Sequence, residues 1–436
     1  MWNRIERSKR APSSVARSLL SWSAPIWLTA SLVVPAAPAF SSSSSSSSPD
    51  HRSGPEPATA KSSSFQQALP GYRYLFPRDH GSHPAFQTEW WYYTGHLQAA
   101  DGRQFGYELT FFRRGVNRPE KTGEGSSPAK EPSRWRIYDL YLAHFALTDL
   151  TKGQFHYAEK ISREGIGKAG ADQDRLRVWI DQWSAMSPVR SDGLATTSAN
   201  GSSKESNAPD GTHHLTAATE TYGIELALSP AKPPVIHGSQ GISRKGAKPG
   251  EASHYYSLTR LSTKGAVTIE GERIPVTGQS WMDHEFGSSE LSADLVGWDW
   301  FSLQLDTGDE LMWYRLRRED GVADPASSGT WVLADGQSIP LTTASIRLDE
   351  LEQWTSPQSG AHYPSRWRLS SKPLDLVVNI DPLLRNQELI TARSTRVTYW
   401  EGAVGVIGTL RGKPVAGRGY VELTGYAKRD DPAMMP

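Results

Sequence analysis

The sequence predicts an all-β protein with two antiparallel β-barrel or sandwich domains in tandem. Short aromatic-rich segments recur at fairly even spacing, and clusters of turn residues separate them. Apolar and polar residues alternate within several segments, as expected for strands with one buried face. No segment shows a convincing helical period over about 11 or more residues. The same texture occurs twice, which divides the folded part of the chain near residue 260.

The bulk composition excludes several classes of protein. The 436 residues carry a formal net charge of +0, so no field of a single sign favours a nucleic-acid partner. The chain has no cysteine, which excludes disulfides, thiolate metal sites and cysteine nucleophiles. Its 16 Trp and 16 Tyr suit both strands and the walls of apolar ligand pockets.

The N-terminus predicts export. Basic residues precede a short apolar run at 25–34, and small residues that a signal peptidase recognises follow at 37–39. The apolar run is shorter than the ~20 residues that cross a bilayer. We therefore expect a signal peptide at 1–39 and a periplasmic or secreted protein; an uncleaved amphipathic anchor is the alternative. A disordered, serine-rich linker is expected at 40–69.

The first folded domain is expected at 70–260. Aromatic runs at 90–97 and 106–112 flank a turn at 100–102, which predicts a hairpin. Four further runs continue the series of strands, at 137–147, 155–159, 176–183 and 222–228. Three insertions rich in Gly, Ser, Lys and Pro are expected to be surface loops, at 117–133, 191–211 and 237–251.

The second folded domain is expected at 261–430. Two strands around a Glu-Gly turn are predicted within 265–277, and the clearest hairpin of the chain spans 298–316. In its first strand, Phe301, Leu303 and Leu305 alternate with polar residues, which indicates one buried face. Further short runs complete this domain, at 331–333, 346–348, 363–369, 374–380, 398–401 and 419–426.

Three aromatic-rich blocks carry a resemblance to a known family. They are HP at 83–84 with EWWYYTGHL at 89–97, GQSWMDHEFGS at 278–288 leading into GWDWF at 297–301, and GRGYVELTGY at 417–426. Together they resemble the signature blocks of the carotenoid 1,2-hydratase (hydroxyneurosporene synthase) and AttH-type family, over roughly 70–430. The resemblance implies two lipocalin-like domains, the second beginning just before the Trp281 block. It also implies a hydrophobic isoprenoid- or lipid-like ligand and, from characterised members, hydration of a carotenoid double bond without metal or organic cofactor.

Hydration of an isolated double bond needs a carboxylic acid that an apolar site keeps neutral near pH 7. If residues 281–286 are extended, Trp281, Asp283 and Glu285 share one face of the strand. We therefore predict Asp283 as general acid, with His284 or Glu285 orienting it or holding the attacking water. The lumen of a lipocalin-like barrel is the expected site. The alternative is structural: Asp283 would pair with Arg315 or Arg317.

Aromatic side chains of two blocks are expected to bind the ligand, because aromatic faces stabilise a developing cation. These ligand-binding candidates are Trp90, Tyr92, Trp281, Trp298 and Trp300. Glu89 is expected beside them as a second acid or ligand anchor, or alternatively as a cap for backbone amides. His83 and His96 are either at a polar rim or structural, and alternation alone does not decide whether Glu422 faces a lumen or solvent.

No cofactor and no metal site are predicted. Asp283, His284 and Glu285 do not form a chelating set, because adjacent strand residues point to opposite faces. The expected partner is a hydrophobic small molecule, with association to a membrane or a transporter as a further expectation and no nucleic acid. Two other functions stay open: a non-catalytic periplasmic carrier of lipids, and an acid-catalysed cyclase or isomerase.

Overall fold

The computed structural model describes residues 65–116, 137–165, 167–188, 211–288, 292 and 294–427. The predicted signal peptide at 1–39, residues 40–64 of the predicted linker, the insertion at 117–133 and residues 191–210 of the second insertion lie outside these ranges. Within the ranges that are described, none of the helices is long and apolar enough to cross a membrane.

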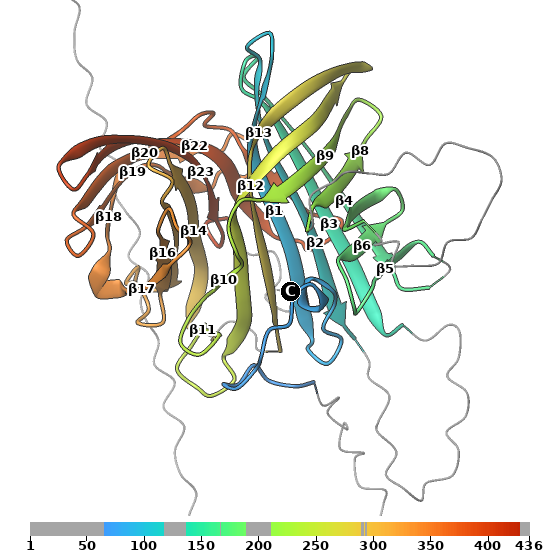
Figure 1. Ribbon diagram of the computed structural model, residues 1–436, viewed down its shortest axis with the longest axis horizontal. Coiled ribbons are helices and arrows are strands. Elements are labelled where there is room, and N and C mark those ends of the chain that lie inside the picture. Colours follow the sequence, from blue (N-terminus) through green and yellow to red (C-terminus); the bar gives the residue numbers. More distant parts are fainter. Residues whose placement is uncertain are drawn as a thin grey trace, which may run out of the picture. The chain divides into compact units, whose positions relative to one another are not determined.

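The described residues are almost entirely β, which confirms the predicted fold class. The first sheet has the order β4-β3-β2-β1-β13-β12-β9-β8-β7-β6-β5, and β10 and β11 also pair with β12 (Figure 1). Its strands are β1 (Thr88–Ala99), β2 (Gln104–Gly115), β3 (Asp139–Asp149), β4 (Gln154–Arg163), β5 (Ala169–Ala171), β6 (Arg177–Ile180), β7 (Trp183–Met186), β8 (His213–Ala218), β9 (Tyr222–Pro230), β10 (Val235–Ile236), β11 (Ile242–Arg244), β12 (Ala252–Ile269) and β13 (Glu272–Gly287).

The second sheet has the order β17-β16-β15-β14-β23-β22-β20-β19-β18, with β21 added beside β22. Its strands are β14 (Leu295–Leu305), β15 (Glu310–Arg318), β16 (Ser328–Val332), β17 (Ser338–Thr342), β18 (Arg347–Thr355), β19 (His362–Ser371), β20 (Leu376–Pro382), β21 (Glu388–Ile390), β22 (Thr398–Leu410) and β23 (Lys413–Leu423). Two short 3-10 turns, Arg78–His80 and Thr343–Ser345, are the only helical elements among the described residues.

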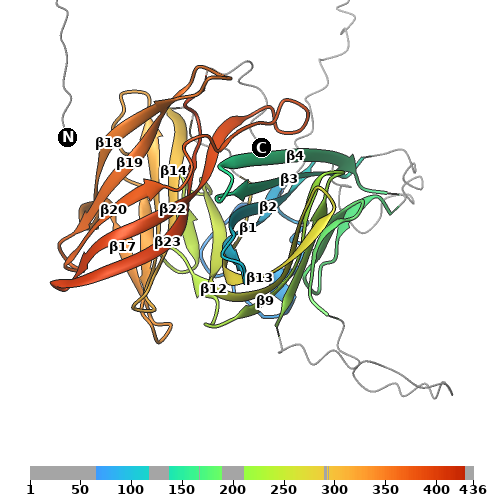
Figure 2. The ribbon, with the colours of Figure 1, turned by 90° about the horizontal axis from the view of Figure 1, so that it is seen from above.

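Both sheets are antiparallel and curled, as expected for tandem lipocalin-like domains (Figure 2). The sheets divide between Gly287 and Leu295, later in the chain than the boundary at 260 and 261 that the sequence suggested. The reason lies in β12, an 18-residue strand whose pairing with β13 shifts register between Leu258 and Leu261. That irregularity interrupts the alternation of side chains and resembles the end of a strand in sequence.

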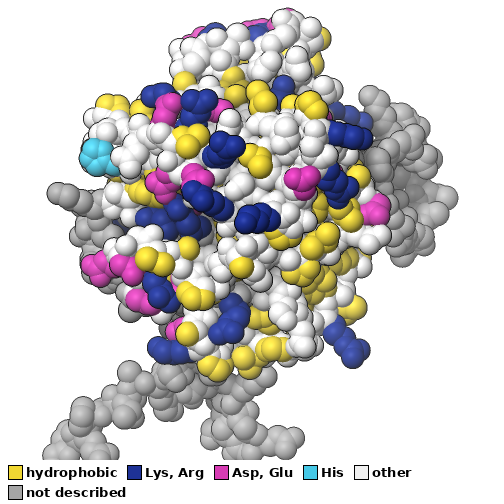
Figure 3. All heavy atoms as spheres, turned by 90° about the vertical axis from the view of Figure 1, so that its left-hand side faces the viewer, with side chains coloured by type: hydrophobic (Ala, Val, Ile, Leu, Met, Phe, Trp, Pro, Cys, Tyr) yellow, Lys and Arg dark blue, Asp and Glu magenta, His cyan; other side chains and the backbone are white. Residues whose placement is uncertain are grey.

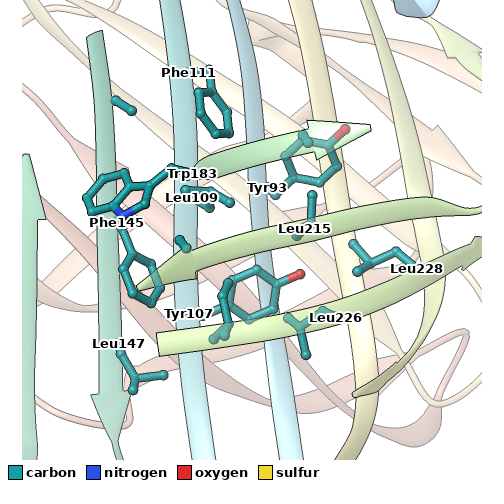
Figure 4. Packing of buried hydrophobic residues seen from close by; sticks show 14 of the residues in the cluster. Tyr93, Tyr107, Leu109, Phe111, Phe145, Leu147, Trp183, Leu215, Leu226 and Leu228 are labelled. Atoms are coloured by element: carbon teal, nitrogen blue, oxygen red, sulfur yellow. The ribbon is translucent and has the colours of Figure 1, made fainter. Parts of the chain in front are cut away.

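Each curled sheet encloses its own packed core. In the first, alternate residues of β1 and β2 point inward, and Tyr93, Tyr107, Leu109 and Phe111 pack against side chains from β3, β7, β8 and β9 (Figure 4). In the second, Phe301, Leu303 and Leu305 are buried, which confirms the alternation predicted for this strand. Large apolar side chains therefore occupy both interiors.

A third apolar cluster lies between the sheets. It combines Tyr92, Tyr255 and Trp281 from the first sheet with Trp300 and Tyr314 from the second. Strands β1, β2 and β12 face β23, β22 and β14 at this junction. Glycine permits the close approach: a Cβ on Gly106 would meet the Tyr420 hydroxyl at 2.5 Å. The site described below is built on this junction.

The outer face of the second sheet has a different character. Basic and acidic side chains are interspersed there with small hydrophobic patches (Figure 3). This mixture agrees with the formal net charge of +0, and that face carries no field of a single sign.

Candidate functional site

A cavity of about 160 Å³ lies between the two sheets. The sequence placed the ligand in the lumen of a barrel, and this expectation is wrong because packed side chains occupy both interiors. The cavity instead uses the outward faces of β1, β2, β12 and β13, together with β14, β15, β22 and β23. Its aromatic walls are Trp90, Tyr92, Phe112, Tyr255, Trp298, Trp300, Tyr314 and Tyr399.

Strand alternation in β13 decides which predicted residues reach the cavity. Asp283 and Glu285 line it, as expected for residues on one face. Between them, His284 points into the first sheet's interior, where its ring stacks on Trp91 with centroids 4.8 Å apart. The structure therefore brings Asp283 and Glu285 together and separates His284 from them.

Asp283 is held by three uncharged donors. Its Oδ2 accepts a hydrogen bond from the Tyr255 hydroxyl at 2.5 Å, and its Oδ1 accepts from the Trp281 indole at 2.6 Å and from the Ser257 hydroxyl. No lysine or arginine of the described residues forms an ion pair with it. Burial raises the pKa of Asp283 to about 7, although the three donors oppose this rise.

The structural alternative for Asp283 is wrong as stated, because both proposed partners bind another carboxylate. Arg315 Nε lies 2.8 Å from Asp299 Oδ2, and Arg317 Nε lies 2.9 Å from Asp299 Oδ1. Asp299 faces away from the cavity on β14, between Trp298 and Trp300, which line it. The two arginines therefore leave Asp283 without a cation.

A buried histidine stands behind Asp283. His237 Nε2 lies 2.6 Å from the Ser257 hydroxyl, which bonds Asp283, and His237 Nδ1 lies 2.8 Å from Thr330 Oγ1. Burial lowers the pKa of His237 to about 3, so its imidazole is neutral at ordinary pH. The chain Asp283–Ser257–His237 orients the carboxyl group through a neutral ring.

The insertion at 237–251 is a surface loop only in part. It includes β11, which pairs with β12, and Lys245, which lines the cavity. Lys245 Nζ lies 2.8 Å from Glu285 Oε1 and 4.4 Å from the centre of the Tyr314 ring. Glu285 thus reaches the cavity as predicted, but as half of an ion pair.

Three further carboxyl groups line the cavity: Glu108, which the sequence did not single out, and Glu401 and Glu422, whose orientation alternation had left open. Burial raises the pKa of Glu108 to about 8 and that of Glu422 to about 7, and it raises the pKa of Glu401 well above its ordinary value. Glu401 and Glu422 are direct cross-strand neighbours, so each also disfavours the charge of the other. Side chains alternate between the two faces of a strand, and Tyr107 and Leu109 point into the first core. This alternation places Glu108 on the opposite face and could have identified it from the sequence.

Glu89 lies on the other face of β1 and does not line the cavity, so its prediction as a ligand anchor is wrong, whereas the alternative holds: its carboxylate accepts hydrogen bonds from the backbone N–H of His83. Its carboxylate contacts Arg113 Nε at 3.0 Å, His83 Nδ1 at 2.7 Å and His284 Nε2 at 2.9 Å. Burial alone would raise the pKa of Glu89, but Arg113 and the two histidines hold it well below its usual range. Parity explains the error, because Trp90 and Tyr92 on the same strand do face the cavity.

Side-chain atoms of His83, Glu89 and His284 lie within 4.8 Å of one another, the spacing of metal ligands. Both rings already contact Glu89, and Arg113 contributes a full positive charge beside it. That charge opposes a second cation, so the group fits an ion-pair network better than a metal centre.

The remaining predicted residues divide simply. Trp90, Tyr92, Trp298 and Trp300 line the cavity as predicted, whereas Trp281 lies behind Asp283 with its ring centre 6.2 Å from that of Trp300. His83 and His96 lie away from the cavity. His83 stacks on Phe286, and His96 Nε2 contacts the Gly419 carbonyl at 2.8 Å.

Comparisons with known proteins agree with this architecture. The AttH-like family model matches residues 67–426. The crystal structure of a putative AttH from Nitrosomonas europaea is 32% identical and covers 83% of this chain and 100% of its own, with a TM-score of 0.70. Kievitone hydratase from Nectria haematococca is 14% identical and covers 82% of this chain and 94% of its own, with a TM-score of 0.56, which shows a shared fold alone. No curated protein matches the chain.

Proposed function

The chain belongs to the AttH-like family, and from its geometry we propose that it binds an apolar small molecule between its two sheets and converts it by acid catalysis. Hydration of a carbon–carbon double bond is the leading reaction. We further propose that the protein acts in the periplasm or after secretion, where a membrane or a transporter supplies the ligand.

One observation carries the proposal: Asp283, a buried carboxyl group bound only by uncharged donors, lines an aromatic cavity. Asp283 is 4% exposed, lacks a cationic partner among the described residues and has a pKa of about 7. A general acid is most effective when its pKa lies near the working pH. A purely structural carboxylate would be better served by an arginine, as Asp299 and Glu89 are.

The reaction balances with the residues present. The Asp283 carboxyl group transfers its proton to one carbon of the double bond, which leaves a carbocation on the other carbon and a carboxylate on Asp283. Water attacks the cation, and the resulting oxonium returns a proton to Asp283. The faces of Trp298, Trp300 and Tyr255 around the cavity stabilise the cation in the interval.

The size of the cavity restricts what reacts there. About 160 Å³ is close to the volume that accommodates an aromatic ring in a protein interior. A phenolic ring would fit largely within it, whereas a terpenoid or a longer isoprenoid chain would place only its reacting end among the acids. The proposal therefore specifies the reacting group more closely than the whole substrate.

The test follows deuterium rather than one assumed product. Mature protein, residues 40–436, is incubated in heavy water with an acyclic carotenoid in detergent and, separately, with the acyclic terpene myrcene. Mass spectrometry then measures deuterium and gain of one water. We expect both labels from the wild type and a loss of about 100-fold or more in Asp283→Asn, the scale of general acid catalysis.

His284→Gln is the matched control, because His284 is next to Asp283 in the chain but points away from the cavity, into the core of the first sheet. Its rate per folded molecule, with the folded fraction taken from thermal unfolding, should stay within a few-fold of the wild type. Deuterium without added water would indicate an isomerase or cyclase. Ligand retained by wild type and Asp283→Asn alike, with no deuterium, would replace catalysis with the carrier function.

A further inference from the structure

We infer that Glu108 and Glu401 form a second polar subsite of the cavity, which binds a carbonyl or hydroxyl oxygen of the ligand. The inference rests on the proposed function and narrows its substrate class. The ligand is an oxygenated apolar molecule, such as a ketone, an alcohol or a phenol, in preference to a pure hydrocarbon.

The two carboxyl groups come from different sheets and meet at one cavity. Glu108 on β2 is 1% exposed and Glu401 on β22 is 2% exposed, and both line the cavity. In each, one oxygen is already bonded: Glu108 Oε1 accepts from the Thr110 hydroxyl, and Glu401 Oε1 accepts from the Tyr92 hydroxyl at 2.7 Å. The other oxygen, Oε2 in both, has no hydrogen-bond partner among the described residues.

The unbonded oxygens are hydrogen-bond donors. No lysine or arginine of the described residues forms an ion pair with Glu108 or Glu401, and Glu422 beside them adds a third acid. Carboxyl groups buried in this way stay neutral. Because Oε1 of each accepts a hydrogen bond, the proton belongs on Oε2, so two O–H groups lack an acceptor.

A buried donor without an acceptor costs about 1–3 kcal/mol, which a ligand oxygen would recover. A hydrocarbon would leave both donors unpaired. An anion would meet the surrounding acids, while Lys245, the cation of the cavity, is already paired with Glu285. A neutral oxygen acceptor is therefore the chemistry that these groups recognise best.

Asp283 has a separate role because both of its oxygens already accept hydrogen bonds from protein groups. Of the other carboxyl groups of the cavity, Glu285 is paired with Lys245 and Glu422 accepts a hydrogen bond from Trp298, whereas Glu108 and Glu401 each offer a free donor. We assign recognition to Glu108 and Glu401 and leave proton transfer with Asp283.

The experiment compares two probes of nearly the same shape, acetophenone and cumene, which differ in a carbonyl oxygen. Quenching of tryptophan fluorescence measures the affinity of mature protein for each. We expect wild type to bind acetophenone about 10-fold more tightly than cumene, the ratio that corresponds to about 1.4 kcal/mol. Glu108→Gln and Glu401→Gln keep an N–H donor and should keep most of the preference.

Glu108→Met and Glu401→Met remove the donors at similar volume, and together they should abolish the preference without weakening cumene binding. Glu388→Gln is the matched control, since Glu388 is a buried carboxyl group bonded to Tyr363 at 2.9 Å and does not line the cavity. Its probe affinities should equal those of the wild type.

The outcomes separate this inference from the function on which it rests. Equal binding of both probes by wild type would overturn the subsite while leaving ligand binding in the cavity intact. Binding of neither probe would overturn both. A preference that survives in the single Met variants and in a folded double variant would assign the donor elsewhere and overturn the role of these two residues.

Discussion

The two faces of the β1–β13 strand pair treat a buried carboxyl group in opposite ways. On the inner face, Glu89 contacts Arg113, and its pKa lies well below the usual range. On the outer face, Asp283 contacts only uncharged donors, and its pKa is raised to about 7. Both side chains are almost fully buried, so burial does not distinguish them. They differ in the charge of the groups that contact them.

The difference separates a group that holds the fold from one that is suited to proton transfer. Arg113 also donates to Asp139 at 2.8 Å and to the backbone carbonyls of His83 and Phe86, which ties the segment before β1 to the sheet. Three neutral donors orient Asp283 without supplying a compensating charge. Hydrogen bonds alone do not offset the loss of hydration by a carboxylate at this site.

The prediction with the largest expected effect concerns the cation beside Glu89. Arg113→Met leaves Glu89 and Asp139 buried beside each other without their shared guanidinium, so we expect the free energy of unfolding to fall by about 3–5 kcal/mol. Urea denaturation measures this change.

Arg103→Met is the control, since Arg103 also contacts two carboxylates, but these partners, Asp101 and Glu272, are exposed to solvent. It should lower the free energy of unfolding far less than Arg113→Met does, because solvent screens its ion pairs. Equal effects of the two substitutions would mean that the inner network does not depend on burial of its charges, and the comparison would lose its basis.

A second test uses pH. The neutral acids of the cavity should contribute less to the stability of the folded protein as pH rises. The folded protein holds protons on Glu108, Glu422 and Asp283 up to about pH 7 to 8, whereas the unfolded chain loses them near pH 4. Their contribution to stability is therefore complete below pH 4 and is lost as pH rises through the folded pKa values. Glu108→Gln should reduce the loss of stability between pH 5 and 8 by about 2–4 kcal/mol.

Buried histidines make stability change with pH in the opposite direction, which provides an internal check on the effect of the acids. The pKa values of His80, His144 and His237 are each lowered to about 3, chiefly by burial. Below about pH 6.5 these histidines bind protons in the unfolded chain but stay unprotonated in the folded protein. The free energy of unfolding therefore falls as pH decreases toward 3. The two effects oppose each other between about pH 4 and 6.5, so urea denaturation should show stability that falls with rising pH only above about pH 6.5. A profile that still rises from about pH 6.5 to 8 would contradict the neutral state of the cavity acids.

Much of the fold was predictable from the sequence because strand signals are local. Alternation at Phe301, Leu303 and Leu305 and the turn chemistry of the hairpins gave the fold class, and parity gave the common face of Asp283 and Glu285. The division of the sheets after Gly287 was not predictable, because a bulge inside a paired strand and the end of a strand have the same local pattern.

The site was only partly predictable, because parity says which residues share a face but not what that face meets. Trp298 and Trp300 were identified, whereas the position of the cavity depends on the packing of one sheet against the other. Lys245 and His237 lie in a segment whose composition indicates a loop, and only its pairing with β12 brings them to the site. Glu108 was detectable by parity, but no sequence pattern distinguishes a neutral buried acid from an ion-paired one.

The prediction with the smallest expected effect asks whether Glu401, like Asp283, is uncharged. Tyr92 on β1 donates to Glu401 on β22 at 2.7 Å, so this hydrogen bond joins the two sheets. If Glu401 is uncharged, Tyr92→Phe removes a bond between neutral groups and should lower the free energy of unfolding by about 0.5–1.5 kcal/mol. A bond to a carboxylate would be worth about 1.5–3 kcal/mol. A measured loss near 3 kcal/mol at pH 6 would therefore mean that Glu401 is ionised, and the contrast between the two faces would not extend beyond Asp283.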